Sequence, residues 1–302
     1  MRHALIVGGH GQDGRLLHQQ LETQGMRVSV LARGDCNLSD FDSVKTLFES
    51  LQPDEIYYVA AFHHSSQDER SLSELGLFRK SQEVHVTGLV HFLETIRMYS
   101  PSTRLFYAAS SLIFGDPLTP MQDESTPFNP VCFYGITKAA GVQCCRFYRS
   151  THGLFASCGI LYNHESPLRQ KKFVIPKIIE GALAIANGKE TNLRLGNLSA
   201  RIDWGYAPDY VDAMMRILRH SSPDDFVIAT GELHSVHEVV ECVFGILGLD
   251  WRAHVEESSS ILTRKRNTLC GNAGKLREAT SWQPTIGFRE MLALLLEARR
   301  HG

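Results

Sequence analysis

A tyrosine and a lysine stand four positions apart in the segment Tyr134-Gly135-Ile136-Thr137-Lys138. In a helix this spacing places both side chains on one face. A lysine ammonium beside a phenol favours the phenolate and lowers the pKa of the tyrosine. The phenolate can then take a proton from a hydroxyl group while hydride leaves the same carbon. Ser110 and Ser111 stand upstream at the end of an apolar run, where Ser110 can hydrogen-bond that hydroxyl. The predicted catalytic residues are Ser110, Ser111, Tyr134 and Lys138.

Four glycines in seven residues follow the first apolar run, in Gly8-Gly9-His10-Gly11-Gln12-Asp13-Gly14. Two frames fit, GxxGxxG on residues 8, 11 and 14 and GxGxxG on residues 9, 11 and 14. Glycines let the backbone approach a pyrophosphate, and the start of the following helix offers N–H groups with a partial positive charge. The cluster predicts a dinucleotide-binding loop. Its expected contact residues are Gly8, Gly11, Gln12, Asp13 and Gly14.

The second predicted strand ends in Val30-Leu31-Ala32-Arg33. An acidic residue at this point would bind the ribose 2′-hydroxyl of NAD, whereas an arginine can meet the 2′-phosphate of NADP. Arg33 therefore favours NADP as the cofactor, and NAD stays possible.

Strand and helix signals alternate through the first half of the chain. Apolar runs predict strands at residues 2–7, 26–31, 55–60, 103–109 and 154–161, and helical periodicity predicts helices at residues 16–22, 41–51, 83–99 and 133–151. Alternation of this kind indicates a Rossmann-type, doubly wound parallel sheet of the α/β class. Ligands bind at the carboxyl edge of such sheets, and this is where Ser110 is expected.

The second half has a looser pattern. Helices are expected at residues 171–187, 209–219, 235–247 and 286–299, with strands at 192–196 and 225–229. We expect a dinucleotide-binding domain at residues 1–162 and a smaller α/β substrate lobe at residues 163–302, packed closely together.

Composition excludes several other classes of protein. The 302 residues are 43% hydrophobic and carry a net charge of −2, which argues against a nucleic-acid binder. No apolar run approaches the roughly 20 residues that span a bilayer. The seven cysteines form no CxxC pair and predict reduced thiols in the cytoplasm. No spacing of His, Cys or Asp resembles a metal site.

Further motifs extend over nearly the whole chain. With these motifs the chain resembles an extended short-chain dehydrogenase/reductase and, within that group, the GDP-mannose 4,6-dehydratase family. The motifs are Ala4-Leu5-Ile6-Val7-Gly8 with Gly11-Gln12-Asp13-Gly14, Asn163-His164-Glu165-Ser166-Pro167, Leu195-Gly196-Asn197-Leu198, Asp203-Trp204-Gly205 and Ile228-Ala229-Thr230-Gly231-Glu232.

The resemblance implies a GDP-sugar substrate in a cleft between the two parts of the chain. It adds to the cofactor site the residues Asn37, Leu38, Ala60, Ala61, Tyr134 and Lys138. The substrate residues that it implies are Asn163, Glu165, Ser166, Val174, Lys177, Leu195, Gly196, Arg201 and Glu232. Ser110 and His63, which follows the third predicted strand beside the cofactor cleft, complete the expected substrate set. It also implies a homodimer or homotetramer, with residues 83–99 and 133–151 as candidate contact helices.

The chain departs from the family pattern at the active site. The family carries a glutamate where this chain has Leu112, and that glutamate moves protons during the elimination of water. A leucine cannot titrate, so we expect hydride transfer at C4 with elimination impaired. Two family arginines are replaced by Ile202 and His237, which leaves Arg201, Arg194 or Lys177 to bind the pyrophosphate.

Several activities remain open. A 4-ketoreductase, a C4 epimerase and a 4-dehydrogenase fit the same residues, as does a dehydratase with a relocated acid/base. A non-catalytic nucleotide-binding partner of a dehydratase is a further alternative. The family's long loop after the second strand is also missing, which affects expectations for cofactor binding and assembly.

Overall fold

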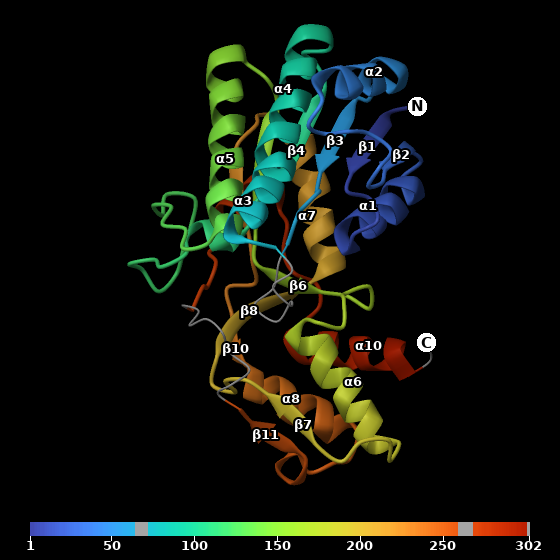
Figure 1. Cartoon of the computed structure of the whole chain (residues 1–302), viewed down its shortest axis with the longest axis vertical. Helices are drawn as coiled ribbons and strands as arrows, with labels where there is room; N and C mark the ends of the chain where they lie inside the picture. Colours follow the sequence, from blue (N-terminus) through green and yellow to red (C-terminus); the bar gives the residue numbers. More distant parts are fainter. Residues whose placement is uncertain (64–71, 259–267, 301–302) are drawn as a thin grey trace.

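The computed structural model describes residues 1–63, 72–258 and 268–300 (Figure 1). Its larger part holds a six-stranded parallel sheet with the order β2-β1-β3-β4-β5-β9. The chain starts in the interior of the sheet, moves to one edge and then crosses to the other side, so the predicted Rossmann-type fold is confirmed. The strands are β1 (His3–Val7), β2 (Arg27–Leu31), β3 (Glu55–Tyr58), β4 (Arg104–Ala108), β5 (Ala156–Leu161) and β9 (Asp225–Ile228).

Helices cover both faces of this sheet (Figure 1). One group packs together as α2 against α4, and α3 and α4 against α5; the other packs as α1 against α7, and α7 against α9. The first group is α2 (Phe41–Leu51), α3 (Glu74–Gln82), α4 (Gly88–Tyr99) and α5 (Phe133–His152), and a π-helical turn (Glu83–Thr87) joins α3 to α4. The second group is α1 (Gln12–Thr23), α7 (Ala207–Arg219) and α9 (Gly274–Thr280).

Local sequence signals explain several helix ends. The side chain of Asp40 accepts a hydrogen bond from the backbone N–H of Ser43 and caps α2. Helix α5 ends at Gly153, whose φ of +67° is the left-handed conformation that glycine adopts without strain. These signals set where α2 begins and where α5 ends.

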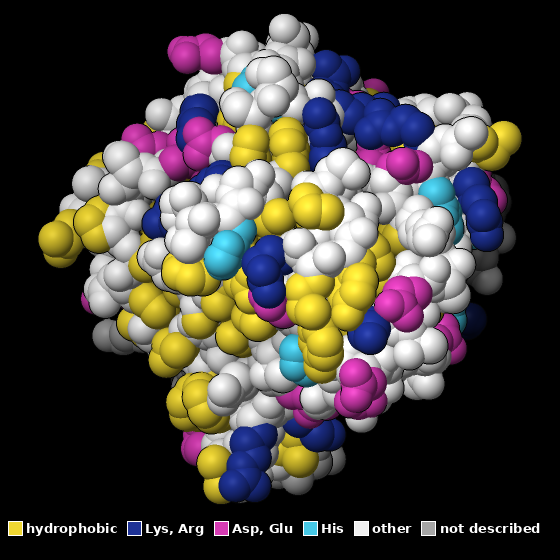
Figure 2. Space-filling view, turned by 90° about the horizontal axis from the view of Figure 1, so that it is seen from above, with side chains coloured by type: hydrophobic (Ala, Val, Ile, Leu, Met, Phe, Trp, Pro, Cys, Tyr) yellow, Lys and Arg dark blue, Asp and Glu magenta, His cyan; other side chains and the backbone are white. Residues whose placement is uncertain are grey.

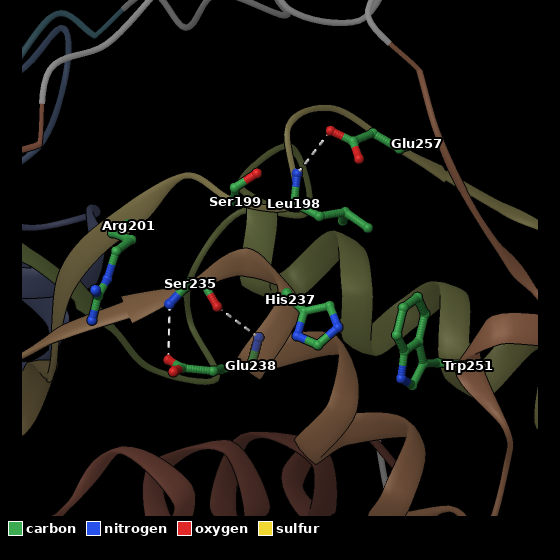
Figure 3. A pocket seen from close by; sticks show the side chains of 8 residues that line it. All are labelled: Leu198, Ser199, Arg201, Ser235, His237, Glu238, Trp251 and Glu257. Atoms are coloured by element: carbon green, nitrogen blue, oxygen red, sulfur yellow. Dashed lines mark hydrogen bonds between the residues drawn. The ribbon is translucent and has the colours of Figure 1, made fainter.

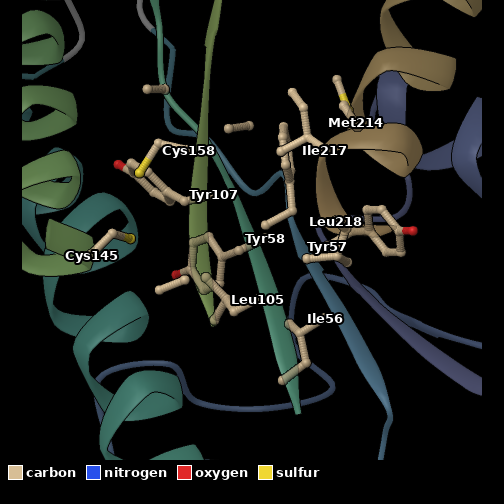
Figure 4. Close-up of a cluster of buried hydrophobic side chains, with 14 of the residues drawn as sticks. Ile56, Tyr57, Tyr58, Leu105, Tyr107, Cys145, Cys158, Met214, Ile217 and Leu218 are labelled. Carbon is tan, nitrogen blue, oxygen red and sulfur yellow. The ribbon is translucent and has the colours of Figure 1, made fainter. Parts of the chain in front are cut away.

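The core of the larger part lies between α5, the sheet and α7 (Figure 4). Tyr58 and Tyr107 are fully buried there, and each hydroxyl finds a backbone carbonyl. Tyr58 donates to the carbonyl oxygen of Val84 at 2.6 Å, and Tyr107 donates to that of His85 at 3.1 Å. Both acceptors belong to the π-helical turn, so the core holds this turn in place.

The smaller part has its own hydrophobic core, built around Trp204, Phe244 and Leu292. Strand β8 pairs with β10 and β6, and β7 pairs with β11. The helices are α6 (Val174–Ala186), α8 (Val236–Ile246) and α10 (Phe288–Arg300), and the strands are β6 (Asn163–Glu165), β7 (Leu193–Leu195), β8 (Arg201–Tyr206), β10 (Leu233–Ser235) and β11 (Val255–Glu257). Because β9 returns to the larger sheet, the chain passes between the two parts repeatedly, and the division at residue 162 remains a prediction.

Other properties concern the described residues alone. No helix among them is long and apolar enough to cross a membrane. None of their His, Cys, Asp and Glu side chains form a group of three or more that could hold a metal ion. All seven cysteines are free thiols.

Candidate active site

The glycine loop between β1 and α1 has the conformation of a phosphate cradle. Gly8 has a φ of +95°, and a Cβ there would lie 2.6 Å from the Cα of Ala60. A Cβ on Gly14 would also clash with the loop backbone, whereas at Gly11 the nearest atom would be 3.5 Å away. Gly11 is the N-cap of α1 and has no side chain to cap it. The loop therefore fits a dinucleotide pyrophosphate at the start of α1, with Ala60 and the exposed Ala61 beside it.

Gln12 and Asp13 tie this loop to the segment after β5. Ser166 donates from Oγ to Oε1 of Gln12 at 2.8 Å. Gln12 in turn donates from Nε2 to the carbonyl oxygen of His164 at 3.2 Å, and Nε2 of His164 lies 2.9 Å from Oδ1 of Asp13. Residues 151 positions apart in sequence thus join the first turn of α1 to β6.

The Asp13–His164 contact is an ion pair in a desolvated position. Burial opposes the charge of Asp13, but the charge and hydrogen bond of His164 prevail and lower the pKa of Asp13 to about 2. Burial likewise opposes the charge of His164, and Asp13 outweighs it and raises the pKa of that imidazole. Each partner keeps the other ionised, so the pair is a charged clamp between the loop and β6.

Helix α5 brings the predicted tyrosine and lysine to the carboxyl end of β4. Lys138 is only 1% exposed, and its Nζ donates to the carbonyl oxygen of Ala108 at 2.7 Å. The same Nζ lies 5.8 Å from the ring centroid of Tyr134. Gly135 lets the start of α5 lie close to the backbone of Leu112, because a Cβ there would lie 2.4 Å from the carbonyl oxygen of Leu112.

The turn that faces α5 carries the two predicted serines. Ser110 caps a 3₁₀ turn (Ser111–Ile113), and its Oγ accepts from the N–H of Leu112 at 3.3 Å. Ser110 and Leu112 are half-buried, and Ser111 is buried. The structure therefore brings all four predicted catalytic residues to one edge of the sheet. It also places the apolar Leu112 in the same turn.

The ionisation of the pair differs from the sequence-based expectation. Desolvation raises the pKa of Tyr134 above its usual value, although the charge of Arg169 acts in the opposite direction. Desolvation also lowers the pKa of Lys138 to about 7, with Asp13 opposing this change. The expected lowering of the tyrosine pKa by a lysine ammonium is therefore wrong for this structure, because burial dominates and the charge that opposes it is that of Arg169.

Two histidines flank the ring of Tyr134. The ring of His63 packs edge-on against it at a centroid distance of 5.2 Å and also contacts Phe173 of the segment before α6. The ring of His85 packs edge-on from the π-helical turn at 5.0 Å. His63 is a predicted substrate residue. His85 is not predicted, because a single histidine in a helical apolar pattern carries no sequence signal of a site.

The segment after β2 lies at the same edge of the sheet. Arg33 is exposed, and a carboxylate stands two residues beyond it: Asp35 accepts through Oδ2 from the backbone N–H of Ala32 at 2.7 Å. Asn37 is exposed and Leu38 is half-buried. The prediction of NADP rests on the last residues of the strand alone. It therefore does not include Asp35, the acidic side chain that folds back onto this turn.

The remaining predicted substrate residues lie in the smaller part. Asn163 is half-buried, whereas Glu165 is 2% exposed, with an oxygen 3.6 Å from Nε of Arg169. Val174 begins α6 and Lys177 stands one turn later, both half-buried. The others are the buried Leu195, the half-buried Gly196, and the exposed Arg201 and Glu232.

A pocket of about 580 Å³ opens in the smaller part (Figure 3). Its wall includes Trp251 and His237, whose rings meet edge to face at 4.8 Å. Of the predicted substrate residues it contains Arg201, whose Nη2 donates to the carbonyl oxygen of Leu233 at 3.0 Å. The lining residues are Leu198, Ser199, Arg201, Ser235, His237, Glu238, Trp251 and Glu257.

Arg201 and Ile202 are consecutive in β8, and consecutive strand residues point to opposite sides. Ile202 packs against the hydrophobic core of the smaller part. Arg201 therefore does not take over the side of the strand that Ile202 occupies. This leaves the position of the missing family arginine apolar.

Comparison with known proteins gives consistent matches. Residues 31–295 match the family model described as GDP-mannose 4,6 dehydratase. The chain is 33% identical over 326 residues to GDP-mannose 4,6 dehydratase 1 of Arabidopsis thaliana, covering 97% of this chain and 88% of that protein.

Two solved structures are similar over their full length. RMD from Pseudomonas aeruginosa complexed with NADPH has a TM-score of 0.85 at 19% identity, with 99% of this chain and 98% of that chain covered. The dTDP-glucose 4,6-dehydratase from Bacillus anthracis in complex with NAD has a TM-score of 0.84 at 18% identity, with 100% and 97% covered. At these identities the two structures support the fold alone.

Proposed function

Because the chain belongs to the GDP-mannose 4,6-dehydratase family, we propose that it transfers hydride at C4 of a GDP-hexose or a related GDP-sugar. The observation that carries this proposal is the meeting of Tyr134 and Lys138 with the Ser110 turn at the carboxyl end of β4. The cradle at Gly8 opens at the same edge of the sheet. A nicotinamide dinucleotide, when bound, supplies the hydride acceptor or donor.

Tyr134 is the proposed acid/base for the C4 oxygen. In the oxidative direction its phenolate takes the hydroxyl proton as the C4–H bond breaks and hydride leaves, which gives a 4-keto sugar. In the reductive direction its phenol donates a proton to the C4 carbonyl oxygen as hydride arrives. Ser110 hydrogen-bonds the same oxygen, and Lys138 sets the electrostatic environment of the phenol.

The apolar Leu112 favours a reaction that is confined to oxidation or reduction at C4, with no elimination of water from C5 and C6. Elimination of water from C5 and C6 needs a base that removes the C5 proton and an acid that donates a proton to the leaving C6 hydroxyl. A leucine supplies neither, and general acid–base help is worth about 10²- to 10⁴-fold. Full dehydration would therefore require an acid/base from elsewhere in the site.

A 4-ketoreductase is the second candidate, because it needs a proton donor for the C4 oxygen but no acid/base for C5 and C6, where this chain has Leu112. Burial raises the pKa of this phenol, so the protonated form predominates at neutral pH. A protonated tyrosine is the form that reduction of a ketone requires. A C4 epimerase and a 4-dehydrogenase use the same residues and are separated from it by their products.

For the cofactor we propose NADP, with NAD as the alternative. The supporting observation is the exposed Arg33 beside the carboxyl end of β2, where a 2′-phosphate would lie. Asp35 on the same turn is a carboxylate that would favour NAD if it released the N–H of Ala32. The proposed contacts also include Asn37 and Leu38.

For the sugar nucleotide we propose a site that uses β6, α6 and the segment after β7. Lys177 is the favoured cation for the pyrophosphate. Arg201 already donates to a backbone carbonyl, and Arg194 lies 3.1 Å from a carboxylate oxygen of Glu256. The other proposed contacts of the sugar nucleotide are His63, Asn163, Glu165, Ser166, Val174, Leu195, Gly196 and Glu232.

We further propose a cytoplasmic homodimer or homotetramer. Hydrophobic side chains gather in one area of the surface seen from above, among charged side chains (Figure 2). Exposed apolar residues on α3, α4 and α5 support a contact through these helices, and they are Leu75, Met98, Tyr99, Ile136 and Phe147. Light scattering of the purified protein gives its mass in solution and tests the assembly. The free thiols support a reducing compartment.

The Tyr134→Phe variant tests the enzyme proposal. Turnover of GDP-mannose and of GDP-4-keto-6-deoxy-mannose is followed in the wild type and in the variant with either cofactor. We expect at least one substrate to react, and the variant to lose about 10²-fold or more of that rate. If no GDP-sugar reacts and the variant behaves as the wild type, the non-catalytic nucleotide-binding partner replaces the enzyme.

A further inference from the structure

His85 occupies an unusual stretch of backbone beside the catalytic tyrosine. It lies in the π-helical turn between α3 and α4, and π-helical turns are often found at functional sites. The two tyrosine hydroxyls of the core hold the carbonyl groups of this turn. His85 itself is 0% exposed, so every polar atom of its ring must find a partner within the protein.

The hydrogen bonds of His85 determine its tautomer. Nε2 accepts from the backbone N–H of Phe62 at 3.0 Å and therefore carries no proton. The proton of the neutral ring is then on Nδ1, which donates to Oγ1 of Thr137 at 2.8 Å. The hydroxyl of Thr137 continues this series of hydrogen bonds by donating to the carbonyl oxygen of Phe133 at 2.8 Å. A protonated ring would direct an N–H at the N–H of Phe62, so the site requires the neutral form.

These two bonds join the two segments that must meet for hydride transfer. Phe62 follows Ala60 and Ala61, the proposed cofactor contacts after β3. Thr137 stands between Tyr134 and Lys138 on α5. The ring of His85 also packs against the ring of Tyr134, so one side chain fixes both the cofactor segment and the orientation of the phenol.

We propose that His85 is a positioning residue, which locks residues 60–63 against α5 so that the bound nicotinamide and Tyr134 meet the same sugar carbon. The proposal rests on the proposed function for its kinetic consequence alone. The hydrogen-bonded link and its effect on cofactor binding follow from the geometry of the chain without any assumed substrate.

Two conservative variants separate the two bonds. In His85→Gln the amide oxygen reaches the place of Nε2 and can still accept from Phe62. In His85→Asn the amide nitrogen takes the place of Nδ1 and can still donate to Thr137, but Phe62 loses its acceptor. His3→Gln is the control, because His3 is another buried histidine with two hydrogen bonds, to the carbonyl oxygen of Leu51 and to Ser29, at the opposite edge of the sheet.

The experiment measures NADPH affinity by fluorescence, the rate of hydride transfer, and the melting temperature. We expect His85→Asn to weaken NADPH binding and to slow hydride transfer by about tenfold or more, the scale of one buried N–H left unpaired. His85→Gln is expected to retain both within about threefold, and His3→Gln to change only the melting temperature. Nitrogen NMR of the free wild type is expected to show the Nδ1–H tautomer from pH 5 to 9.

Three results overturn the proposal. They are an Nε2–H tautomer, titration of His85 within that pH range, and wild-type NADPH affinity in a folded His85→Asn protein. If the wild type turns over no GDP-sugar, the proposed function fails instead, while NADPH affinity and NMR still decide the role of His85.

Discussion

Replacing Asp13 by asparagine removes the charge that holds the glycine loop to β6. The side chains of Asp13 and His164 are 20% and 9% exposed, so solvent screens the pair only weakly. The pKa of Asp13 falls from an ordinary value of 3.8 to about 2. Because one pKa unit corresponds to about 1.4 kcal/mol, we expect Asp13→Asn to lower the free energy of unfolding by about 2 kcal/mol at pH 6.

The pH dependence of this loss has a definite sign. The pKa of Asp13 is lowered on folding, so its contribution is present above pH 3.8 and is lost as the pH falls toward 2. The pKa of His164 is raised on folding, so its contribution is present below pH 6.5 and is lost as the pH rises through the folded value. The difference between wild type and variant is therefore greatest between about pH 4 and 6.5 and shrinks at pH 9.

Urea unfolding at pH 6 and pH 9 measures this difference. The control is Asp42→Asn, because Asp42 is an exposed aspartate at the same second position of α2. The control loses its interaction with the helix dipole, about 0.3–1 kcal/mol, and a solvent-screened interaction with the charge of Lys45. A loss from Asp13→Asn that matches the control, or that is equal at pH 6 and pH 9, would refute the charged clamp.

Three more variants probe the site. Gly8→Ala is expected to abolish NADPH binding measured by fluorescence and to lower the melting temperature more than Gly25→Ala. Both glycines have positive φ, but of the two only Gly8 has backbone atoms within 3 Å of a new Cβ. Equal losses of melting temperature and NADPH binding in the two variants would contradict the cradle. Leu112→Glu is expected to introduce elimination of water, detected by NMR in D₂O as deuterium at C5 of the product, whereas the control Leu112→Gln is not. If Leu112→Glu gains no elimination activity, Leu112 is not what limits elimination. Lys138→Met is expected to lower the rate of hydride transfer by about 10²-fold or more and to stabilise the fold at pH 6 by up to about 4 kcal/mol. Burial lowers the pKa of Lys138 to about 7, so the stability of the wild type rises with pH between this value and the ordinary lysine pKa. A variant that unfolds at lower urea concentration than the wild type would contradict the cost of burying this lysine.

Much of the larger part of the fold could be predicted because its strands are apolar runs and its helices have buried stripes. Helix α2 begins and ends where the sequence predicts, since Asp40 caps it and its apolar spacing is regular. The sequence does not predict helix α3, because only Leu77 and Ser81 are buried in it, which leaves almost no apolar stripe. Strands of three residues, such as β6 and β10, are too short to show alternation.

The site could be predicted only where its residues belong to local patterns. The glycine loop and the Tyr134–Lys138 pair are such patterns, and the structure brings the pair to the predicted edge of the sheet. The Asp13–His164 clamp and the link through His85 depend on contacts between distant positions, so no local spacing indicates them. The ionisation of Tyr134 also depends on burial, which the spacing of two residues does not determine.

The central proposal is that this chain carries out redox chemistry at C4 and that Leu112 impairs the elimination of water. The most direct test incubates the protein and NADP with GDP-mannose in D₂O, and separately supplies NADPH with GDP-4-keto-6-deoxy-mannose, and follows both sugars by NMR. We predict no 6-deoxy-4-keto product from GDP-mannose, together with hydride transfer at C4 in at least one of the two reactions. A 6-deoxy-4-keto sugar with deuterium at C5 would contradict the proposal.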